Sequence, residues 1–238
     1  MAGVLYLVPN LLGAVEPAAV LPARTLDTAR RLRHFVVETP KPARAFLKGI
    51  GTQLAIASLD IQALPDARSA RAADFVPLLG PAMAGEDVGV LSDAGCPGVA
   101  DPGARLVEAA HRHGVRVVPL VGPSAILLAL MASGMNGQRF AFHGYLPVKA
   151  EARAAALARL HEDARKRGET QLFIETPYRN AAMLAATVDA LPPSAQLCVA
   201  ADLTLPTETV ERRLVAAWRG EAFGRFDRRP AIFLLDAA

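Results

Sequence analysis

The stretch that most constrains the fold of this chain is residues 91–103, which read L-S-D-A-G-C-P-G-V-A-D-P-G. A short apolar run at 87–91 precedes it and predicts a buried strand, and the apolar spacing of 104–113 predicts a helix after it. Glycines permit positive φ and close approach of a ligand, while prolines stiffen the path. Since open α/β sheets bind ligands at the carboxyl ends of strands, we expect a ligand-binding loop. The alternative is a plain connector, with Asp101 capping the helix and Pro102 at its first position.

Strands and helices alternate along the first half of the chain. Strands are expected at 4–8, 35–37, 54–58, 87–91 and 115–120, and helices at 25–32, up to 48, 72–84, 104–113 and 125–133. This alternation predicts an α/β domain over 1–135, with a mostly parallel sheet and helices on both faces.

The second half has more strands than helices. Strands are expected at 140–143, 171–175, 197–202, 208–214 and 231–235, and helices at 150–167 and 180–190. Residues 134–139 (G-M-N-G-Q-R) are the best linker, so we expect an α+β domain with a mixed sheet over 136–238.

Composition excludes several classes of protein. Hydrophobic residues make up 52% and charged residues 21%, which favours a sizeable core over disorder. The net charge of +3 permits a nucleic-acid partner without requiring one. Two distant cysteines indicate neither a disulfide framework nor a zinc site. The first residues do not form a signal peptide, and the longest apolar run, 125–132, is too short to span a bilayer, so we expect a cytoplasmic protein.

The familiar catalytic motifs are absent. The chain has no P-loop, no G-x-G-x-x-G and no G-x-S-x-G, and its five histidines are not spaced with acids as metal ligands. Asp93 and Asp101 could hold Mg²⁺, but no phosphate-binding motif accompanies them, so we expect no metal. What remains are loops at strand ends: 9–13, 92–103, 122–125, 145–147, 175–177 and 202–206. Such loops suit an uncharged or zwitterionic cofactor that carries the reactive group itself.

Four motifs resemble a known family. S-D-A-G-C-P-G-V-A-D-P-G, V-R-V-V-P-L-V-G-P-S-A, F-H-G-Y-L-P and L-F-I-E-T-P-Y-R are similar, in this order and spacing, to motifs of the tetrapyrrole-methylase superfamily. Within it, the chain most resembles the ribosomal RNA small subunit methyltransferase I branch, as a short, divergent member. The resemblance implies two α/β domains with S-adenosylmethionine in the cleft between them, and usually a homodimer.

The resemblance also implies which residues contact the cofactor. These are Pro9, Ala94, Gly95, Cys96, Val99, Asp101, Ser124, Ala125, Leu146, Glu175, Thr176 and Leu203. Ser124 is equally well explained as the cap of the helix that it precedes.

Four segments depart from the family pattern. Residues 8–15 of this chain read V-P-N-L-L-G-A-V where the family has V-P-T-P-I-G-N-L, and residues 38–41 read E-T-P-K where the family has E-D-T-R. Residues 58–60 read S-L-D in place of an H-D-H-N-like segment, and residues 148–153 read V-K-A-E-A-R in place of K-S-K-G-R-R. We expect these segments on the substrate-facing surface and not at cofactor contacts.

The favoured function is therefore S-adenosylmethionine-dependent methylation, with the ribose 2′-hydroxyl of ribosomal RNA in the small subunit as the expected acceptor. A methyltransferase for a small molecule such as a tetrapyrrole, or a protein that binds the cofactor or a nucleotide without catalysis, are the alternatives. Glu38 and Glu175 each end an expected strand and are the candidate bases. For each, the alternative is a buried structural acid paired with an arginine.

A group of basic residues in the first domain could bind RNA phosphates: Arg24, Arg30, Arg31, Arg33, Lys41, Arg44 and Lys48. A solvated helix face explains them equally well.

Overall fold

The computed structural model describes residues 2–66 and 69–237. The chain divides into two compact units, residues 1–124 and 125–238. This corrects the boundary expected after residue 135. Helix α6 (Ala125–Ser133) packs on three strands of the second sheet. The expected linker, residues 134–139, starts with a turn at the end of this helix, and Arg212 stabilises that turn by donating to the carbonyls of Ser133 and Gly134.

The first unit contains a parallel five-stranded sheet, as the sequence predicted, with strand order β3-β2-β4-β1-β5. Its strands are β1 (Val4–Val8), β2 (His34–Val37), β3 (Asp60–Ala63), β4 (Val88–Leu91) and β5 (Arg116–Pro119). Strand residues alternate between two cores, so that Val37 and Leu91 lie in one, while Val36 and Val90 lie in the other.

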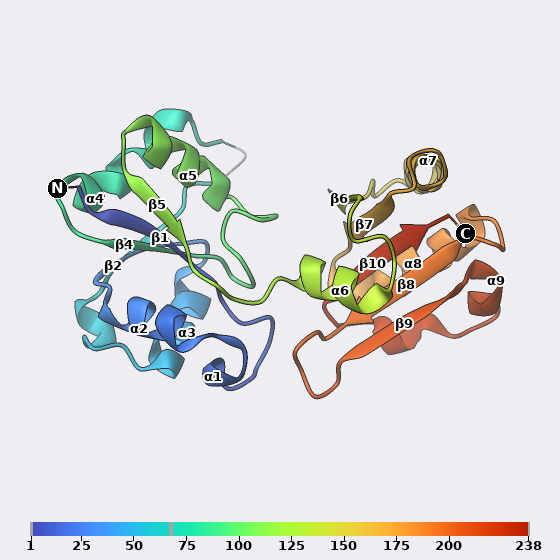
Figure 1. Ribbon diagram of the computed structural model, residues 1–238, viewed down its shortest axis with the longest axis horizontal. Helices are drawn as coiled ribbons and strands as arrows, with labels where there is room; N and C mark the ends of the chain where they lie inside the picture. Colours follow the sequence, from blue (N-terminus) through green and yellow to red (C-terminus); the bar gives the residue numbers. More distant parts are fainter. Residues whose placement is uncertain (1, 67–68, 238) are drawn as a thin grey trace. The chain divides into compact units, whose positions relative to one another are not determined.

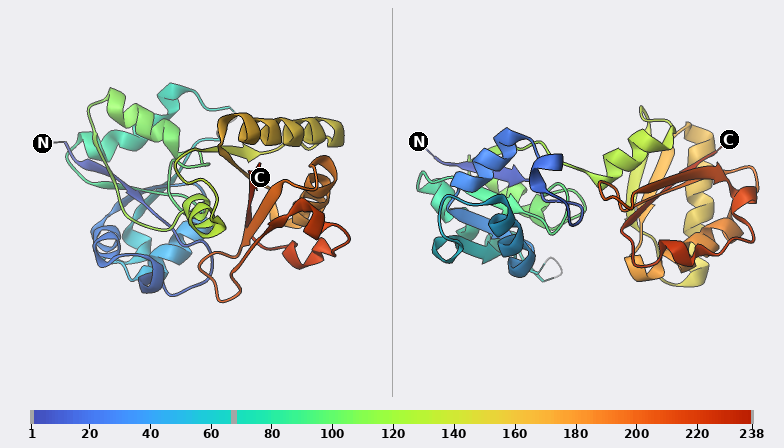
Figure 2. Two further views of the ribbon diagram at one scale, coloured as in Figure 1. Left: turned by 45° about the vertical axis from the view of Figure 1, so that its right-hand side comes forward. Right: turned by 90° about the horizontal axis from the view of Figure 1, so that it is seen from below.

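Helices cover both faces of this sheet, which confirms that expectation. Helices α2 (Ala23–Arg31) and α3 (Pro40–Ile50) pack on one face, and α5 (Gly103–Arg112) packs on the other (Figures 1 and 2). A short helix, α1 (Pro17–Val20), precedes α2.

Two predicted elements of the first unit were wrong. Residues 54–58 contain a 3₁₀ turn, η1 (Ile56–Ser58), and the edge strand β3 starts only at Asp60. The helix expected over 72–84 is divided into η2 (Ala72–Phe75), η3 (Pro77–Leu79) and α4 (Gly80–Met83). Each of the last two pieces has a proline in its first turn, because proline lacks the amide hydrogen that a continuous helix needs.

The second unit contains a mixed five-stranded sheet in the order β6-β7-β10-β8-β9. Its strands are β6 (Phe140–Tyr145), β7 (Thr170–Ile174), β8 (Gln196–Ala201), β9 (Thr209–Leu214) and β10 (Ala231–Asp236). Strands β6 and β7 are parallel and the other pairs are antiparallel.

One face of this second sheet carries a large apolar core. Helices α7 (Ala150–Arg167), α8 (Asn180–Ala190) and α9 (Val215–Trp218) pack there, with the turns η4 (Pro177–Arg179) and η5 (Phe223–Phe226) nearby. The rings of Phe173 and Phe233 stack at a centroid distance of 5.2 Å within it. Over residues 2–66 and 69–237, no helix is both long enough and apolar enough to cross a membrane.

The connections of the first sheet create a switch point between β1 and β4. These strands are neighbours, but their connections run in opposite directions along the sheet. The chain passes from β1 beyond β4 to reach β2, and from β4 beyond β1 to reach β5. In open parallel sheets, the loops after two such strands separate and leave room for a ligand at the carboxyl edge. The loop over 92–103 lies at this position.

His34 joins three segments at the opposite edge of the first sheet. Its Nδ1 lies 3.0 Å from Asp60 Oδ2 and its Nε2 lies 2.8 Å from Glu86 Oε2. Burial lowers the pKa of His34, but the hydrogen bonds and charges of the two carboxylates outweigh burial and raise it above its ordinary value. The hydrogen bond from His34 holds the pKa of Asp60 below its usual range.

We therefore expect His34→Gln to destabilise the protein in a pH-dependent way. A raised pKa means that the protonated ring stabilises the fold fully below about pH 6.5, and that this contribution is lost as pH rises through the higher folded pKa. Because Glu86 is largely exposed, the loss near pH 5.5 should be about 1 kcal/mol or less. Urea unfolding at pH 5.5 and pH 9 checks this; an equal loss at both would contradict it.

Candidate active site

Asn10 fastens the loop after β1 to the loop after β4. Its backbone amide donates to the Gly95 carbonyl at 2.8 Å, and its side-chain Nδ2 donates to the carbonyls of Ser92 at 3.0 Å and Asp93 at 3.2 Å. The side chain is buried, so these bonds satisfy both of its hydrogens. Sequence reasoning named Pro9 and missed Asn10; the only signal was its place at the end of a buried strand.

Asp93 links the same loop to the start of α3. Thr39 donates to the Asp93 carboxylate twice, from its amide at 3.1 Å and from its hydroxyl at 2.7 Å. In return, the Asp93 amide donates to Glu38 Oε2 at 3.0 Å. Asn10 and Thr39 both lie in segments that depart from the family pattern, and in this structure both bind the glycine-rich loop itself.

Glu38 is half-buried beside this loop. Burial raises the pKa of its carboxyl; the Asp93 amide lowers it, and the charges of Asp93 and Asp101 raise it again, with a net increase. No arginine forms an ion pair with Glu38 among the described residues. A carboxylate that follows a strand at the candidate edge and has no arginine partner in the described part of the chain is a candidate to accept a proton.

Asp101 closes the far end of the loop. Its Oδ1 accepts hydrogen bonds from the amides of Gly98 at 2.8 Å and Gly103 at 2.6 Å. The cap residue of α5 is Pro102, so the predicted cap at Asp101 is one residue off. Its Oδ2 is buried and has no partner within residues 2–66 and 69–237, and burial, partly offset by the two amides, raises the pKa of the carboxyl. A ligand's donor would satisfy that oxygen.

The backbone of the loop is held in an unusual conformation. Gly95 and Gly98 have φ of 69° and 83°, and Ala100 has φ of 61° although it carries a Cβ. Non-glycine residues keep such angles only where the surroundings enforce them, commonly at ligand sites.

A third loop, which follows β5, completes this edge. The Cys96 thiol donates to the Pro123 carbonyl at 3.4 Å, and burial raises the pKa of that thiol. Gly122 lies directly against Pro9, since a Cβ added to the glycine would stand 2.3 Å from the Pro9 Cβ. The structure thus collects the predicted residues of the first unit on three loops at one edge: Pro9, Ala94, Gly95, Cys96, Val99, Asp101 and Ser124.

The remaining predicted residues belong to the second unit. Ala125 begins α6, while Leu146, Glu175, Thr176 and Leu203 follow β6, β7 and β8, whose carboxyl ends share one edge of the second sheet. Glu175 is buried; its Oε1 accepts from the Thr176 amide at 2.7 Å and its Oε2 lies 3.1 Å from Arg179. The alternative of an arginine-paired acid therefore describes Glu175 and not Glu38.

Backbone strain also marks the loop after β8. Asp202 and Thr204 have φ of 52° and 73°, and Arg229 pairs with Asp202 at 2.7 Å. The Thr204 hydroxyl is buried without a partner in the described part of the chain.

A groove of about 490 Å³ opens beside the glycine-rich loop in the first unit. We call it the α3 groove. Its lining comes from the loop after β1, from α3 and from the glycine-rich loop: residues 10–15, Pro17, Pro42, Ala45, Phe46, Gly49, Asp93 and Ala94.

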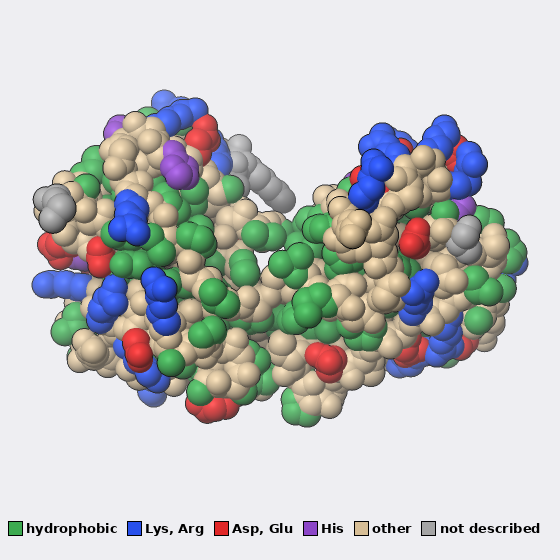
Figure 3. All heavy atoms as spheres, viewed as in Figure 1, with side chains coloured by type: hydrophobic (Ala, Val, Ile, Leu, Met, Phe, Trp, Pro, Cys, Tyr) green, Lys and Arg blue, Asp and Glu red, His purple; other side chains and the backbone are tan. Residues whose placement is uncertain are grey.

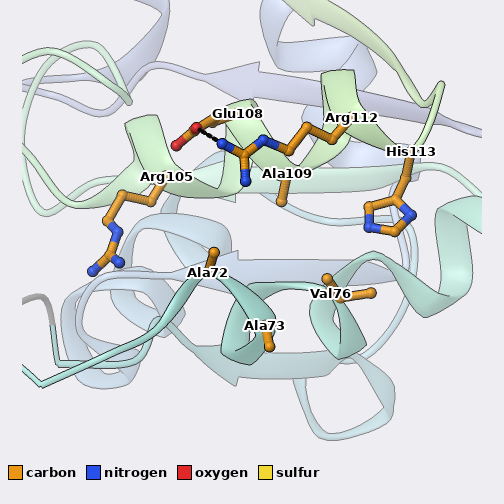
Figure 4. A pocket seen from close by; sticks show the side chains of 8 residues that line it. All are labelled: Ala72, Ala73, Val76, Arg105, Glu108, Ala109, Arg112 and His113. Carbon is orange, nitrogen blue, oxygen red and sulfur yellow. Dashed lines mark hydrogen bonds and ion pairs between the residues drawn. The ribbon is translucent and has the colours of Figure 1, made fainter.

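A smaller depression of about 180 Å³ lies between α5 and η2 (Figure 4). Within it, Glu108 forms an ion pair with Arg112, and none of the predicted site residues contributes to its lining. The candidate site at the carboxyl edge therefore shares no residue with this depression.

Residues 15–217 match the family model described as Tetrapyrrole (Corrin/Porphyrin) Methylases. The chain belongs to the tetrapyrrole methylase family. A Vibrio cholerae protein named ribosomal RNA small subunit methyltransferase I is 31% identical over 88% of this chain and 68% of its own length. A Mesorhizobium japonicum protein of the same name is 43% identical over 53% of this chain and 42% of its own length.

The fold agrees with this family assignment. The crystal structure of the methyltransferase CobJ superimposes with a TM-score of 0.64 over 100% of this chain and 95% of its own, at 17% sequence identity. The family model and the named relatives identify this tetrapyrrole methylase as a methyltransferase, and the superposition shows that its fold is shared.

We expect Gly122→Ala to disrupt the site through packing. The new Cβ would overlap the Pro9 ring, which cannot rotate away, so we expect a loss of about 1–3 kcal/mol in stability. Thermal unfolding measures it. Gly49→Ala is the matched control, because no atom lies within 4 Å of the added Cβ and alanine favours a helix; equal effects of the two changes would contradict the tight contact.

Proposed function

We propose that this protein transfers a methyl group from S-adenosylmethionine to ribosomal RNA of the small subunit. The observation that carries the proposal is the 31% identity to a ribosomal RNA small subunit methyltransferase I over 88% of the chain. The architecture of the carboxyl edge in the first unit supports it, because the glycine-rich loop of the shared motif lies there at the switch point.

The residues of this edge fit such a cofactor. S-adenosylmethionine supplies an activated methyl group, so the protein needs to bind, orient and exclude water. Main-chain groups of the glycine-rich loop can approach a ligand closely, and the unpartnered Asp101 Oδ2 can accept a hydrogen bond from a hydroxyl or ammonium group.

Glu38 is the candidate base for a ribose hydroxyl. Its raised pKa, its position at the carboxyl edge and its lack of an arginine partner among the described residues suit proton acceptance. Glu175 is instead proposed to position the loop after β7, because both of its oxygens are engaged. Contact of Leu146, Thr176, Leu203 and Ala125 with the cofactor stays a prediction.

A tetrapyrrole acceptor is the second candidate. The family description names corrin and porphyrin methylases, which favours it. We prefer the ribosomal RNA target because the relatives that are 31% and 43% identical to this chain are named ribosomal RNA small subunit methyltransferase I, whereas the methyltransferase CobJ is only 17% identical.

A homodimer and a cytoplasmic location are proposed with the same target. Helix α6 is apolar on all sides, yet Leu127 and Met131 are exposed. Helices of that composition are usually buried, so a second copy of the chain is a suitable partner.

The cofactor site predicts that Ala94→Trp weakens binding of S-adenosylmethionine and S-adenosylhomocysteine by roughly tenfold or more. Ala94 is exposed and does not have a positive φ, so the indole should fill the site without straining the backbone. Isothermal titration measures the affinity. Ala158→Trp, on the exposed side of α7, is the control; normal cofactor affinity in Ala94→Trp would place the site elsewhere.

The acceptor is tested by transfer of a radioactive methyl group to purified, unmodified small ribosomal subunits. We expect incorporation into small-subunit RNA, and a decrease in kcat on the order of 10²-fold in Glu38→Gln with unchanged cofactor affinity. Large subunits and a uroporphyrinogen serve as comparison acceptors. Transfer only to the tetrapyrrole would replace the first candidate function with the second.

A further inference from the structure

Helix α3 carries two parallel rows of side chains with different chemistry. Pro42, Ala45, Phe46 and Gly49 follow the i, i+3, i+4, i+7 spacing of one helix face and line the α3 groove. The adjoining face carries a basic row at i, i+3 and i+7, formed by Lys41, Arg44 and Lys48. All three are exposed.

The α3 groove is suited to a flat, uncharged ring. Leu11, Leu12 and Val15 face α3 across it, and Asp93 is its one acidic lining residue. The Asp93 carboxylate already accepts two hydrogen bonds from Thr39. The other side chains that line the groove are mainly apolar. A volume of about 490 Å³ falls within the usual range for ligand pockets.

The basic row differs from the two arginines at the end of α2. Arg30 donates to the Ile50 carbonyl and pairs with Asp27, while Arg31 donates to Tyr6. By contrast, Lys41, Arg44 and Lys48 make no side-chain hydrogen bond or ion pair with any residue that the structure describes. Helix α3 contains no acidic residue that could neutralise them. Figure 3 shows lysine and arginine side chains over the region where Figure 1 draws α2 and α3.

The geometry connects the row to the active site. Thr39 is the residue before α3 and binds Asp93 of the glycine-rich loop, so the helix starts at the site and leads away from it. Lys48 lies seven positions beyond Lys41 along the helix, a rise of about 10 Å, which is long enough to reach more than one phosphate of a strand.

We propose that α3 binds single-stranded RNA, with a base in the α3 groove and the neighbouring phosphates on Lys41, Arg44 and Lys48. Unpaired bases pack against apolar and aromatic side chains while cations follow the backbone, which is the usual mode for single strands. This inference rests on the proposed function, since it assigns the acceptor's binding surface beside the same site.

The first test removes the charges with Lys41→Gln, Arg44→Gln and Lys48→Gln combined. The probe is a fluorescent 12-nucleotide RNA of mixed sequence, titrated by anisotropy at several salt concentrations. We expect the slope of log affinity against log salt to fall in magnitude by about 2, since each phosphate contact in a single strand contributes about 0.7. The control is Arg139→Gln, Arg159→Gln and Arg219→Gln combined, which removes the same charge from exposed positions of the second unit. Equal slopes in the two variants would overturn the proposal.

The second test fills the groove with Ala45→Trp, or with Gly49→Leu if the first variant is unstable. Ala45 is exposed and no atom lies within 4 Å of a Cβ at Gly49. We expect at least a tenfold loss of affinity for the RNA and a much smaller loss of cofactor affinity than Ala94→Trp causes, since Ala94 borders this groove and also lies in the glycine-rich loop. The same RNA as a duplex should bind weakly to the unmodified protein. Unchanged single-strand binding, or equally tight binding of poly-glutamate, would overturn the assignment of the groove to a base.

The two proposals fail in different ways. If the unmodified protein methylates no ribosomal RNA, the proposed function fails, whatever α3 binds. If it methylates small subunits and the α3 variants retain the activity and KM of the control variant, the function stands and the α3 surface is wrong.

Discussion

The hydrogen bonds of Asn10 are the interaction on which the carboxyl edge of the first unit depends. Strands β1 and β4 are neighbours whose connections leave in opposite directions, so the loops after them share no continuous secondary structure. One buried side chain and one amide join these loops, through Ser92, Asp93 and Gly95. The positive φ at Gly95, Gly98 and Ala100 is sustained by this network together with Asp101. Without it, the loop would be free to relax and the closely placed backbone groups would be lost.

The acidic residues at the candidate edge of the first unit have different partners from those in the loops of the second unit, and this difference indicates different roles. Glu175 and Asp202 are each neutralised by an arginine, which suits acids that fix loops in place. Glu38 and Asp101 have no arginine among the residues described; backbone amides bind them, and burial raises the pKa of both. Perturbed acids of this kind concentrate at functional sites. The reactive side of the proposed chemistry therefore belongs to the first unit.

Helix α3 combines three tasks in eleven residues. Ala43, Phe46, Leu47 and Ile50 are buried in the core, and Phe46 also borders the α3 groove. Thr39, before the helix, binds the glycine-rich loop. The exposed side carries Pro42, Ala45 and Gly49 of the apolar row together with the basic row. The pattern P-K-P-A-R-A-F-L-K-G-I is sufficient to predict a helix with an apolar face. The basic residues of α2, however, look the same in sequence as those of α3. Only the structure shows that Arg30 and Arg31 are bound to the protein itself.

The sequence by itself determined the alternation of strands and helices, the parallel and mixed sheets, and the family, because short apolar strands and glycine-rich motifs are local patterns. It predicted Gly95, Cys96 and Asp101 correctly as parts of one loop. The sequence placed the unit boundary after residue 135 and a strand at 54–58, whereas the structure has the boundary at 124 and the strand β3 at Asp60–Ala63. The reason is that α6 and β3 are positioned by packing partners far away in sequence. Tertiary structure alone decided that Asn10 and Thr39 hold the loop and that Glu38, unlike Glu175, has no arginine partner among the described residues. Those outcomes depend on side chains 50 or more residues apart meeting at one sheet edge, and no local pattern encodes such contacts.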